Sequence, residues 1–228
     1  MSSNIINPFR FAAAAVDEGG VVWDTAKWRC HKGKPSWDTD DTRFLGMPGE
    51  VNHTISNGSG DGTHYAEFLV TNNDELTGAG VVTPEWHTGT CSSDSAGATP
   101  TDSLQSYMTD QAGGIWKVDE NVKTANGDIS VAATDVANRI GIEVDPVGGM
   151  NGSEVRFYEV ESDGTRTQLG GTFDYMNHGV DFDPLTSGTP EFSFAATSYD
   201  GAGSVTIYSN SADWWGTPTG GYVVMTSD

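Results

Sequence analysis

Short alternating segments between residues 139 and 208 constrain the fold of this chain more than any other feature. Apolar side chains recur at every second position in segments 139–145, 154–158, 191–196 and 203–208. That spacing is the side-chain period of a β-strand with one buried face. Glycine-rich turns separate the segments, and short strands joined in this way are typical of an antiparallel β-sandwich. We therefore expect an all-β chain that folds as an antiparallel sandwich of the jelly-roll type.

The first half of the chain contains further candidate strands. Residues 51–56 and 63–70 flank the Gly-rich stretch 57–62, so we expect them to form a hairpin. In the second of these strands, the predicted core face carries His64, Ala66, Phe68 and Val70, and the opposite face carries Tyr65, Glu67 and Leu69. Residues 78–82 continue the pattern, and residues 114–118 and 129–131 are weaker candidates.

Residues 1–20 differ from the rest of the chain, so we expect an N-terminal arm (1–20) and a sandwich domain (21–228). Pro8 disfavours a central strand in the arm. Its exposed apolar side chains would dock on the sandwich or on a partner. The residues that we predict to anchor a partner are Ile5, Ile6, Phe9 and Phe11.

The acidic charge of the chain lies almost entirely after residue 43. The net charge is −21, and residues 1–43 contribute none of it, because they hold six basic and six acidic residues. The rest of the chain holds five basic and 26 acidic residues. Such a body repels phosphate, which argues against nucleic acid as a partner. Solubility is the preferred explanation of the charge, and an acidic interaction surface is the alternative.

Targeting signals and cysteines point to a cytosolic origin. No apolar run is long enough to span a bilayer, and the first residues lack the basic and apolar regions of a secretory signal. We expect no membrane insertion. Cys30 and Cys91 allow one disulfide at most, and two free thiols are expected in a cytosol. Neither lies in a Cys/His cluster, so we predict no structural zinc site.

An acidic cluster follows Trp37. Asp38, Asp40 and Asp41 offer the hard oxygen ligands that Ca²⁺ prefers. Arg43 stands where an EF-hand loop needs glycine, so we favour a solvated acidic turn over a calcium site.

Glu143 and Asp145 alternate on one predicted strand and therefore share a face. Glycosidases of concanavalin-like fold use a Glu-x-Asp-x-x-Glu pattern, because cleavage of the glycosidic bond needs two carboxyl groups. The third acid is missing here, since residue 148 is glycine. We prefer a solvated strand face or a structural acid, and we expect no catalytic residue.

Aromatic side chains near loops could stack on sugar rings or fill a pocket of a partner. Packing in the core or at an edge is the preferred role for any single one of them. Because neighbours in a strand point to opposite faces, one ring of the Trp214-Trp215 pair should be exposed. The candidates for ligand stacking are Trp86, Trp116, Trp214, Trp215 and Tyr222.

Residues 51–210 resemble a SPRY (B30.2-like) domain, which is a concanavalin-like sandwich used for binding. The resemblance rests on the strand Gly141-Ile-Glu-Val-Asp145, the strand Val155-Arg-Phe-Tyr158 and the Asp163-Gly164 turn, which occur in family order. It implies the sandwich fold and a role in recognition. A polar loop at 88–105 and a long stretch at 172–190 depart from the pattern, so no binding residue is carried over.

The opening Ile5-Ile-Asn-Pro-Phe-Arg-Phe11 resembles the N-termini of bacteriophage virion proteins. We therefore predict a non-enzymatic virion component, assembled in the host cytoplasm. Its preferred role is in a tail fibre or tail tip that binds a host surface glycan or protein. Capsid decoration, a soluble lectin-like module and a glycoside hydrolase are the alternatives. The expected partners are other virion proteins and copies of the same chain in a homo-oligomer.

Overall fold

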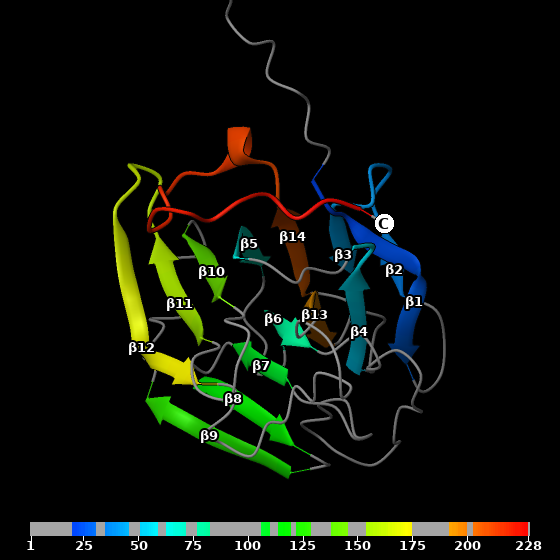
Figure 1. The fold of residues 1–228 in the computed structure, drawn as a ribbon. Helices are drawn as coiled ribbons and strands as arrows, with labels where there is room; N and C mark the ends of the chain where they lie inside the picture. The colour runs from blue at the N-terminus through cyan, green and yellow to red at the C-terminus, as the bar shows by residue number, and fades with distance from the viewer. Residues whose placement is uncertain are drawn as a thin grey trace, which may run out of the picture.

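A computed structural model describes residues 20–30, 35–45, 51–58, 63–71, 77–82, 106–109, 114–119, 122–128, 138–145, 154–174, 192–199 and 203–227. These residues form two seven-stranded antiparallel sheets that lie face to face (Figure 1). Sheet I has the order β1 (Trp23–Cys30), β4 (Val51–Ser56), β13 (Ser193–Tyr199), β6 (Gly78–Val82), β7 (Ser106–Thr109), β8 (Gly114–Asp119) and β9 (Val122–Asp128). Sheet II has the order β12 (Arg166–Asp174), β11 (Glu154–Val160), β10 (Arg139–Asp145), β5 (His64–Thr71), β14 (Ser204–Tyr208), β3 (Arg43–Leu45) and β2 (Ser36–Trp37). The predicted antiparallel β-sandwich is confirmed.

The apolar core lies between the two sheets. Phe68 of sheet II packs with its ring centroid 6.1 Å from that of Trp23 and 5.4 Å from that of Phe194, both in sheet I. All three rings are almost completely buried. The predicted core face of β5 is confirmed at Ala66 and Phe68, which belong to this cluster. Burial of large rings is the main driving force that holds two such sheets together.

The predicted hairpin of residues 51–70 is wrong. β4 pairs with β1 and β13 in sheet I, whereas β5 pairs with β10 and β14 in sheet II. The Gly-rich stretch between them therefore connects the two sheets. Alternation predicts which face of a strand is buried, but it does not predict the neighbouring strand.

Two other predicted strands have different outcomes. The segment at 114–118 is confirmed as β8, which continues to Asp119. The segment at 129–131 lies outside the described residues, and the strand that precedes it, β9, spans Val122–Asp128. Residues 1–19 also lie outside the described residues, so the division into arm and sandwich stays a prediction.

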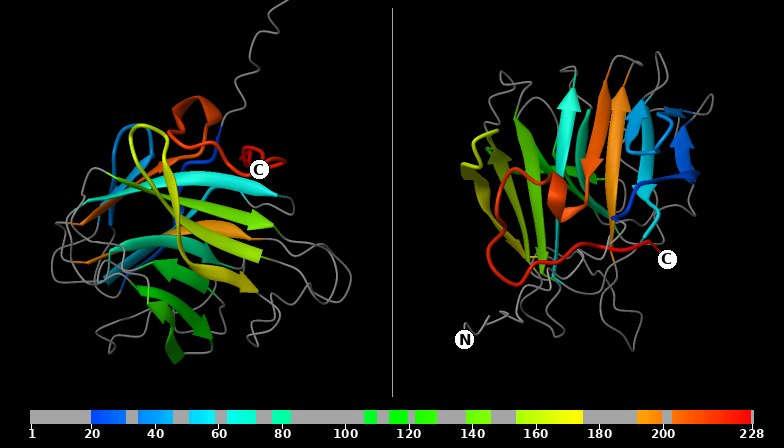
Figure 2. Two further views of the ribbon diagram at one scale, coloured as in Figure 1. Left: turned by 90° about the vertical axis from the view of Figure 1, so that its left-hand side faces the viewer. Right: turned by 90° about the horizontal axis from the view of Figure 1, so that it is seen from above.

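The segment after β14, Ser209–Ser227, crosses the outer face of sheet II, and we call it the covering segment (Figure 2, right). It begins with a single 3-10 turn at Ser211–Asp213, which is the only helix among the described residues. Two isolated bridges fix its far end, one from Val223 to His64 and one from Thr226 to Gly20. None of the described helical residues could form a membrane span.

Candidate functional site

The outer face of sheet II carries two glutamates beneath the covering segment. Glu67 on β5 pairs across the strands with Gly141 on β10, and Glu143 on β10 pairs with Tyr65. Because residues two apart in a strand share a face, Tyr65, Glu67, Gly141 and Glu143 all point to the same side of the sheet. Tyr65 and both glutamates have no exposed surface. Burying a carboxylate is costly unless it is paired, so the partners of these groups decide what the face can do.

Glu67 is held by an arginine, a tyrosine and the backbone of the covering segment. Its Oε1 accepts hydrogen bonds from the Tyr65 hydroxyl at 3.0 Å and from the Gly216 amide at 2.8 Å. Its Oε2 accepts from Arg139 Nη1 and from the Trp215 amide, each at 3.0 Å. Both oxygens are therefore fully engaged.

Arg139 is as tightly surrounded as its glutamate partner. Its side chain is 8% exposed, and Nη1 also donates to the Asp213 carbonyl at 2.6 Å. The guanidinium lies 3.5 Å from the centre of the Tyr208 ring and 4.0 Å from that of Trp215. Two cation–π contacts on a desolvated guanidinium add to its ion pair with Glu67.

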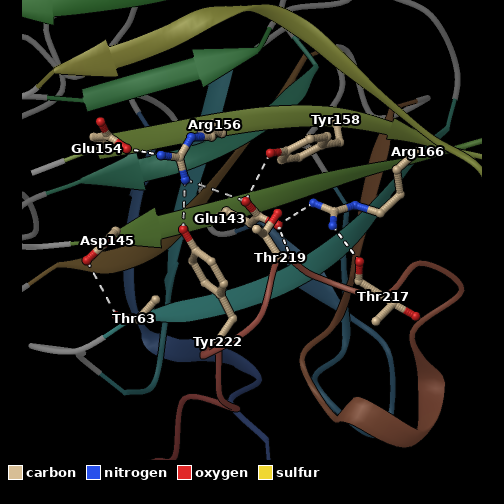
Figure 3. A network of polar contacts seen from close by, with 10 residues as sticks. All are labelled: Thr63, Glu143, Asp145, Glu154, Arg156, Tyr158, Arg166, Thr217, Thr219 and Tyr222. Atoms are coloured by element: carbon tan, nitrogen blue, oxygen red, sulfur yellow. Dashed lines mark hydrogen bonds and ion pairs between the residues drawn. The ribbon is translucent and has the colours of Figure 1, made fainter.

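Glu143 is the centre of a second network, which Figure 3 shows. Its Oε1 accepts a hydrogen bond from Arg166 Nη2 and a second one, of 2.9 Å, from the Thr219 amide. Its Oε2 accepts from the Tyr158 hydroxyl at 3.0 Å, and Arg156 Nη1 lies 3.8 Å away. Arg166 also donates to the Thr217 carbonyl of the covering segment at 2.5 Å. The expectation of a solvated strand face is wrong, and Glu143 is a structural acid.

The tyrosines around these carboxylates stay protonated at neutral pH. Burial, followed by the negative charge of Glu143, raises the pKa of Tyr222 to about 12. The same two causes raise the pKa of Tyr158, and burial followed by the charge of Glu67 raises the pKa of Tyr65. Tyr65 and Tyr158 therefore keep their hydroxyl protons and donate hydrogen bonds to the carboxylates over the whole physiological pH range.

This arrangement leaves neither carboxylate free for acid–base chemistry. A general acid or base must reach its substrate within hydrogen-bond distance, and here the protein itself occupies that space. Asp145 is partly buried and accepts a hydrogen bond from Thr63 Oγ1 at 3.4 Å. The pair that suggested a glycosidase thus contains one carboxyl group sealed beneath the covering segment and one at its margin.

The predicted stacking residues whose side chains the structure describes, namely Trp214, Trp215 and Tyr222, all contact sheet II. Trp214 and Trp215 follow the 3-10 turn and do not lie in a strand, so the expectation that they point to opposite faces of one is wrong. Both are partly buried: the Trp214 and Tyr65 rings are nearly perpendicular with their centroids 4.8 Å apart, and Trp215 covers Arg139. The Tyr222 hydroxyl accepts a hydrogen bond from Arg156 Nη1 at 3.0 Å.

The other predicted site residues lie wholly or partly outside the described part of the chain. Trp116 is on β8, where only the backbone is described. Cys30 is the last residue of β1, where again only the backbone is described. The remaining residues lie in segments that the structure does not describe, namely Ile5, Ile6, Phe9, Phe11, Trp86 and Cys91.

The acidic cluster after Trp37 forms the turn between β2 and β3. Asp38 Oδ1 accepts from the Arg43 amide at 3.0 Å, and Oδ2 accepts from Thr42 Oγ1 at 3.1 Å. Asp41 has a positive φ of 56° and closes the turn. Among the described residues, no group of three or more His, Cys, Asp or Glu side chains could hold a metal ion. The Asp38 carboxylate stabilises this turn through these two hydrogen bonds.

Sequence reasoning missed the arginines that hold the face together. Only five basic residues follow residue 43, and three of them are Arg139, Arg156 and Arg166. In so acidic a chain, the concentration of these three arginines in residues 139–166, which also contain Glu143, was a usable signal. What the sequence did not show was that a distant segment would fold over them.

Comparisons with known proteins show the fold and no more. No family model matches the chain, and no curated protein matches it in sequence. Among solved structures, the PSpry domain of TRIM65 aligns with 83% of this chain and 89% of its own, at 12% identity and a TM-score of 0.51. The alignment with arcelin-5, a lectin-like defense protein from Phaseolus vulgaris, covers 79% of this chain and 90% of the arcelin chain, at 8% identity and a TM-score of 0.46. The alignment with the carbohydrate binding module CBM66 from Bacillus subtilis covers 79% of this chain and 91% of that module, at 12% identity and a TM-score of 0.40.

The likeness to the PSpry domain agrees with the two facing sheets. At 12% identity it establishes the architecture and transfers no site residue. The described residues of this chain form a SPRY-like, concanavalin-like β-sandwich domain.

Proposed function

We propose that this chain is a non-enzymatic recognition domain of a bacteriophage virion, most directly a tail-fibre or tail-tip component that binds a host surface glycan or protein. Residues 1–20 would anchor it to neighbouring virion subunits. The observation that carries the non-enzymatic part is the state of Glu143, which is completely buried and engaged through both carboxylate oxygens.

The case against hydrolysis is geometric. Glycoside hydrolysis needs two carboxyl groups on either side of the scissile bond. A sugar could approach Glu143 only if the covering segment left, which would also remove the Thr219 amide from that carboxylate. The sandwich is then a rigid scaffold whose loops can carry recognition, as loops on rigid folds commonly do.

The virion part of the proposal is supported by the sequence of the arm, which resembles the start of phage virion proteins. A recognition domain mounted in many copies gains strength through multivalency, because several weak sites act together. A homo-oligomer suits such a role.

The test uses the purified full-length chain in three assays. Binding to a glycan panel and to whole host cells, without cleavage of a broad polysaccharide panel, is the expected result. Antibody labelling of phage particles should mark the tail tip; label over the head would replace host adhesion by capsid decoration. Cleavage of any polysaccharide that is lost in Glu143→Gln would overturn the non-enzymatic proposal. Particles without label would remove the virion role and leave a free binding module.

A further inference from the structure

The outer face of sheet II holds the covering segment mainly through its main chain. Glu67 accepts hydrogen bonds from the amides of Trp215 and Gly216, and Arg139 donates to the carbonyl of Asp213. Each acid–arginine pair therefore offers an acceptor and a donor side by side, as the edge of a neighbouring strand would.

The second pair repeats the arrangement a few residues further along. Glu143 accepts from the amide of Thr219, and Arg166 donates to the carbonyl of Thr217. Figure 3 shows both side chains meeting the covering segment from β10 and β12. The face is thus built to bind an extended peptide through its backbone, at two points set by the spacing of residues 213–219.

Side chains restrict which peptide fits. A Cβ at residue 216 would lie 2.7 Å from Arg166 Cδ and 3.0 Å from Val160 Cγ1, so any larger residue here must displace Arg166 or the covering segment. Trp215 must lie over the Arg139 guanidinium, and Trp214 must pack perpendicular to the Tyr65 ring. A second copy of this chain carries a segment that meets all of these requirements.

The link between the covering segment and β14 is suited to opening. The 3-10 turn Ser211–Asp213 contains no buried residue, and its cap is a local hydrogen bond from the Ala212 amide to Asn210 Oδ1. Straightening this turn would lengthen the connection at little cost, and the contacts of residues 213–219 would be identical in a neighbour. Exchange of an identical element between copies is a low-cost route to an oligomer.

We propose that the outer face of sheet II is a peptide-binding site for residues 213–219, and that copies of this chain associate by exchanging their covering segments across it. This association goes beyond the recognition role above, because it holds whatever ligand the domain binds. It predicts that emptying the site in one copy makes it available to the segment of another.

The experiment uses full-length variants and a fluorescent peptide that spans residues 209–227. Gly216→Val should expel the chain's own segment and leave the face intact. Gly220→Ala is the matched control, because a Cβ at residue 220 meets nothing within 4 Å. Fluorescence anisotropy should show the peptide binding Gly216→Val at least about tenfold more tightly than wild type or Gly220→Ala, since their sites are already occupied. A peptide that itself carries Gly216→Val should not bind.

Failure of the peptide to bind a folded Gly216→Val chain, or equal binding to all three chains, would overturn the peptide site. If Gly216→Val does not fold, Thr219→Pro replaces it, since it removes one amide donor and adds little volume. Exchange is tested separately with two tagged wild-type chains that are unfolded and refolded together at high concentration. Mixed oligomers that form on refolding together, but not on mixing chains that are already folded, support exchange. Chains that remain monomeric, or that mix equally well without unfolding, overturn it.

Discussion

Two buried layers lie on opposite sides of sheet II, and they are built from different chemistry. The layer between the sheets contains rings and aliphatic side chains, with Phe68 and Phe194 at its centre. The layer beneath the covering segment contains charged and phenolic groups, with Glu67 and Glu143 at its centre. Both glutamates are as completely buried as Phe68. Apolar contacts are non-directional, whereas the polar layer depends on each donor finding its acceptor.

Complete burial therefore does not determine how well a layer tolerates amino-acid substitutions. The apolar layer should accept any side chains of similar volume. The polar layer should fail when one charge is lost, even without a change of shape, because the partner is then left buried and unpaired.

The largest expected effect is that of Glu67→Gln. The substitution keeps the shape of the side chain but removes the charge that faces the buried guanidinium of Arg139. Urea unfolding should show a loss of about 3–5 kcal/mol. Glu161→Gln, at an exposed position of the β11–β12 turn, is the control and should change stability by no more than about 0.5 kcal/mol. Equal effects of the two variants would contradict a charge-dependent layer.

Overpacking the polar layer comes next. A Cβ at Gly141 would lie 2.6 Å from the Tyr65 hydroxyl oxygen and 2.9 Å from Val160 Cγ2. Gly141→Ala should therefore destabilise the domain by about 1–3 kcal/mol in the same urea assay. Gly220→Ala, which meets open space, should be close to neutral. A neutral Gly141→Ala would mean that the layer is loosely packed.

A change of shape in the apolar layer should cost less. Phe68→Leu keeps an apolar side chain among Trp23, Phe194 and their neighbours. We expect a loss of less than about 1.5 kcal/mol, well below that of Glu67→Gln, since cores tolerate apolar substitutions of similar volume. A loss larger than that of Glu67→Gln would reverse the comparison between the layers.

The smallest effect is a dependence on high pH. Burial raises the pKa of Tyr222 from 10.0 to about 12, so the folded state disfavours the ionised phenol more than the unfolded state does. Its contribution to stability is complete below pH 10 and is lost as the pH rises through the window from about 10 to about 12. Unfolding midpoints of Tyr222→Phe should therefore fall less steeply across that window than those of wild type. Parallel pH curves for the variant and wild type would show that Tyr222 does not belong to the polar layer.

The sequence predicted the apolar layer well and the polar layer poorly. The alternation in β5 identified Ala66 and Phe68 as core residues, because burial of one face leaves a period of two. The same alternation assigned Tyr65 and Glu67 to the other face, where polar side chains read as solvent-exposed. They are buried because the covering segment, about 150 positions away, packs Trp214 against Tyr65 and donates the amides of Trp215 and Gly216 to Glu67. Contacts between residues so far apart in the sequence leave no recognisable pattern in either segment.

Amide hydrogen exchange tests the central claim, that the carboxylates of sheet II are sealed beneath the covering segment. The amides of Trp215, Gly216 and Thr219 donate to Glu67 and Glu143, whereas the amide of Ala212 lies in an exposed turn. We expect the first three amides to exchange orders of magnitude more slowly than that of Ala212, near the rate set by global unfolding. Exchange of all four at similar rates would mean that the face is open to solvent and to substrates, and that the carboxylates are not sealed.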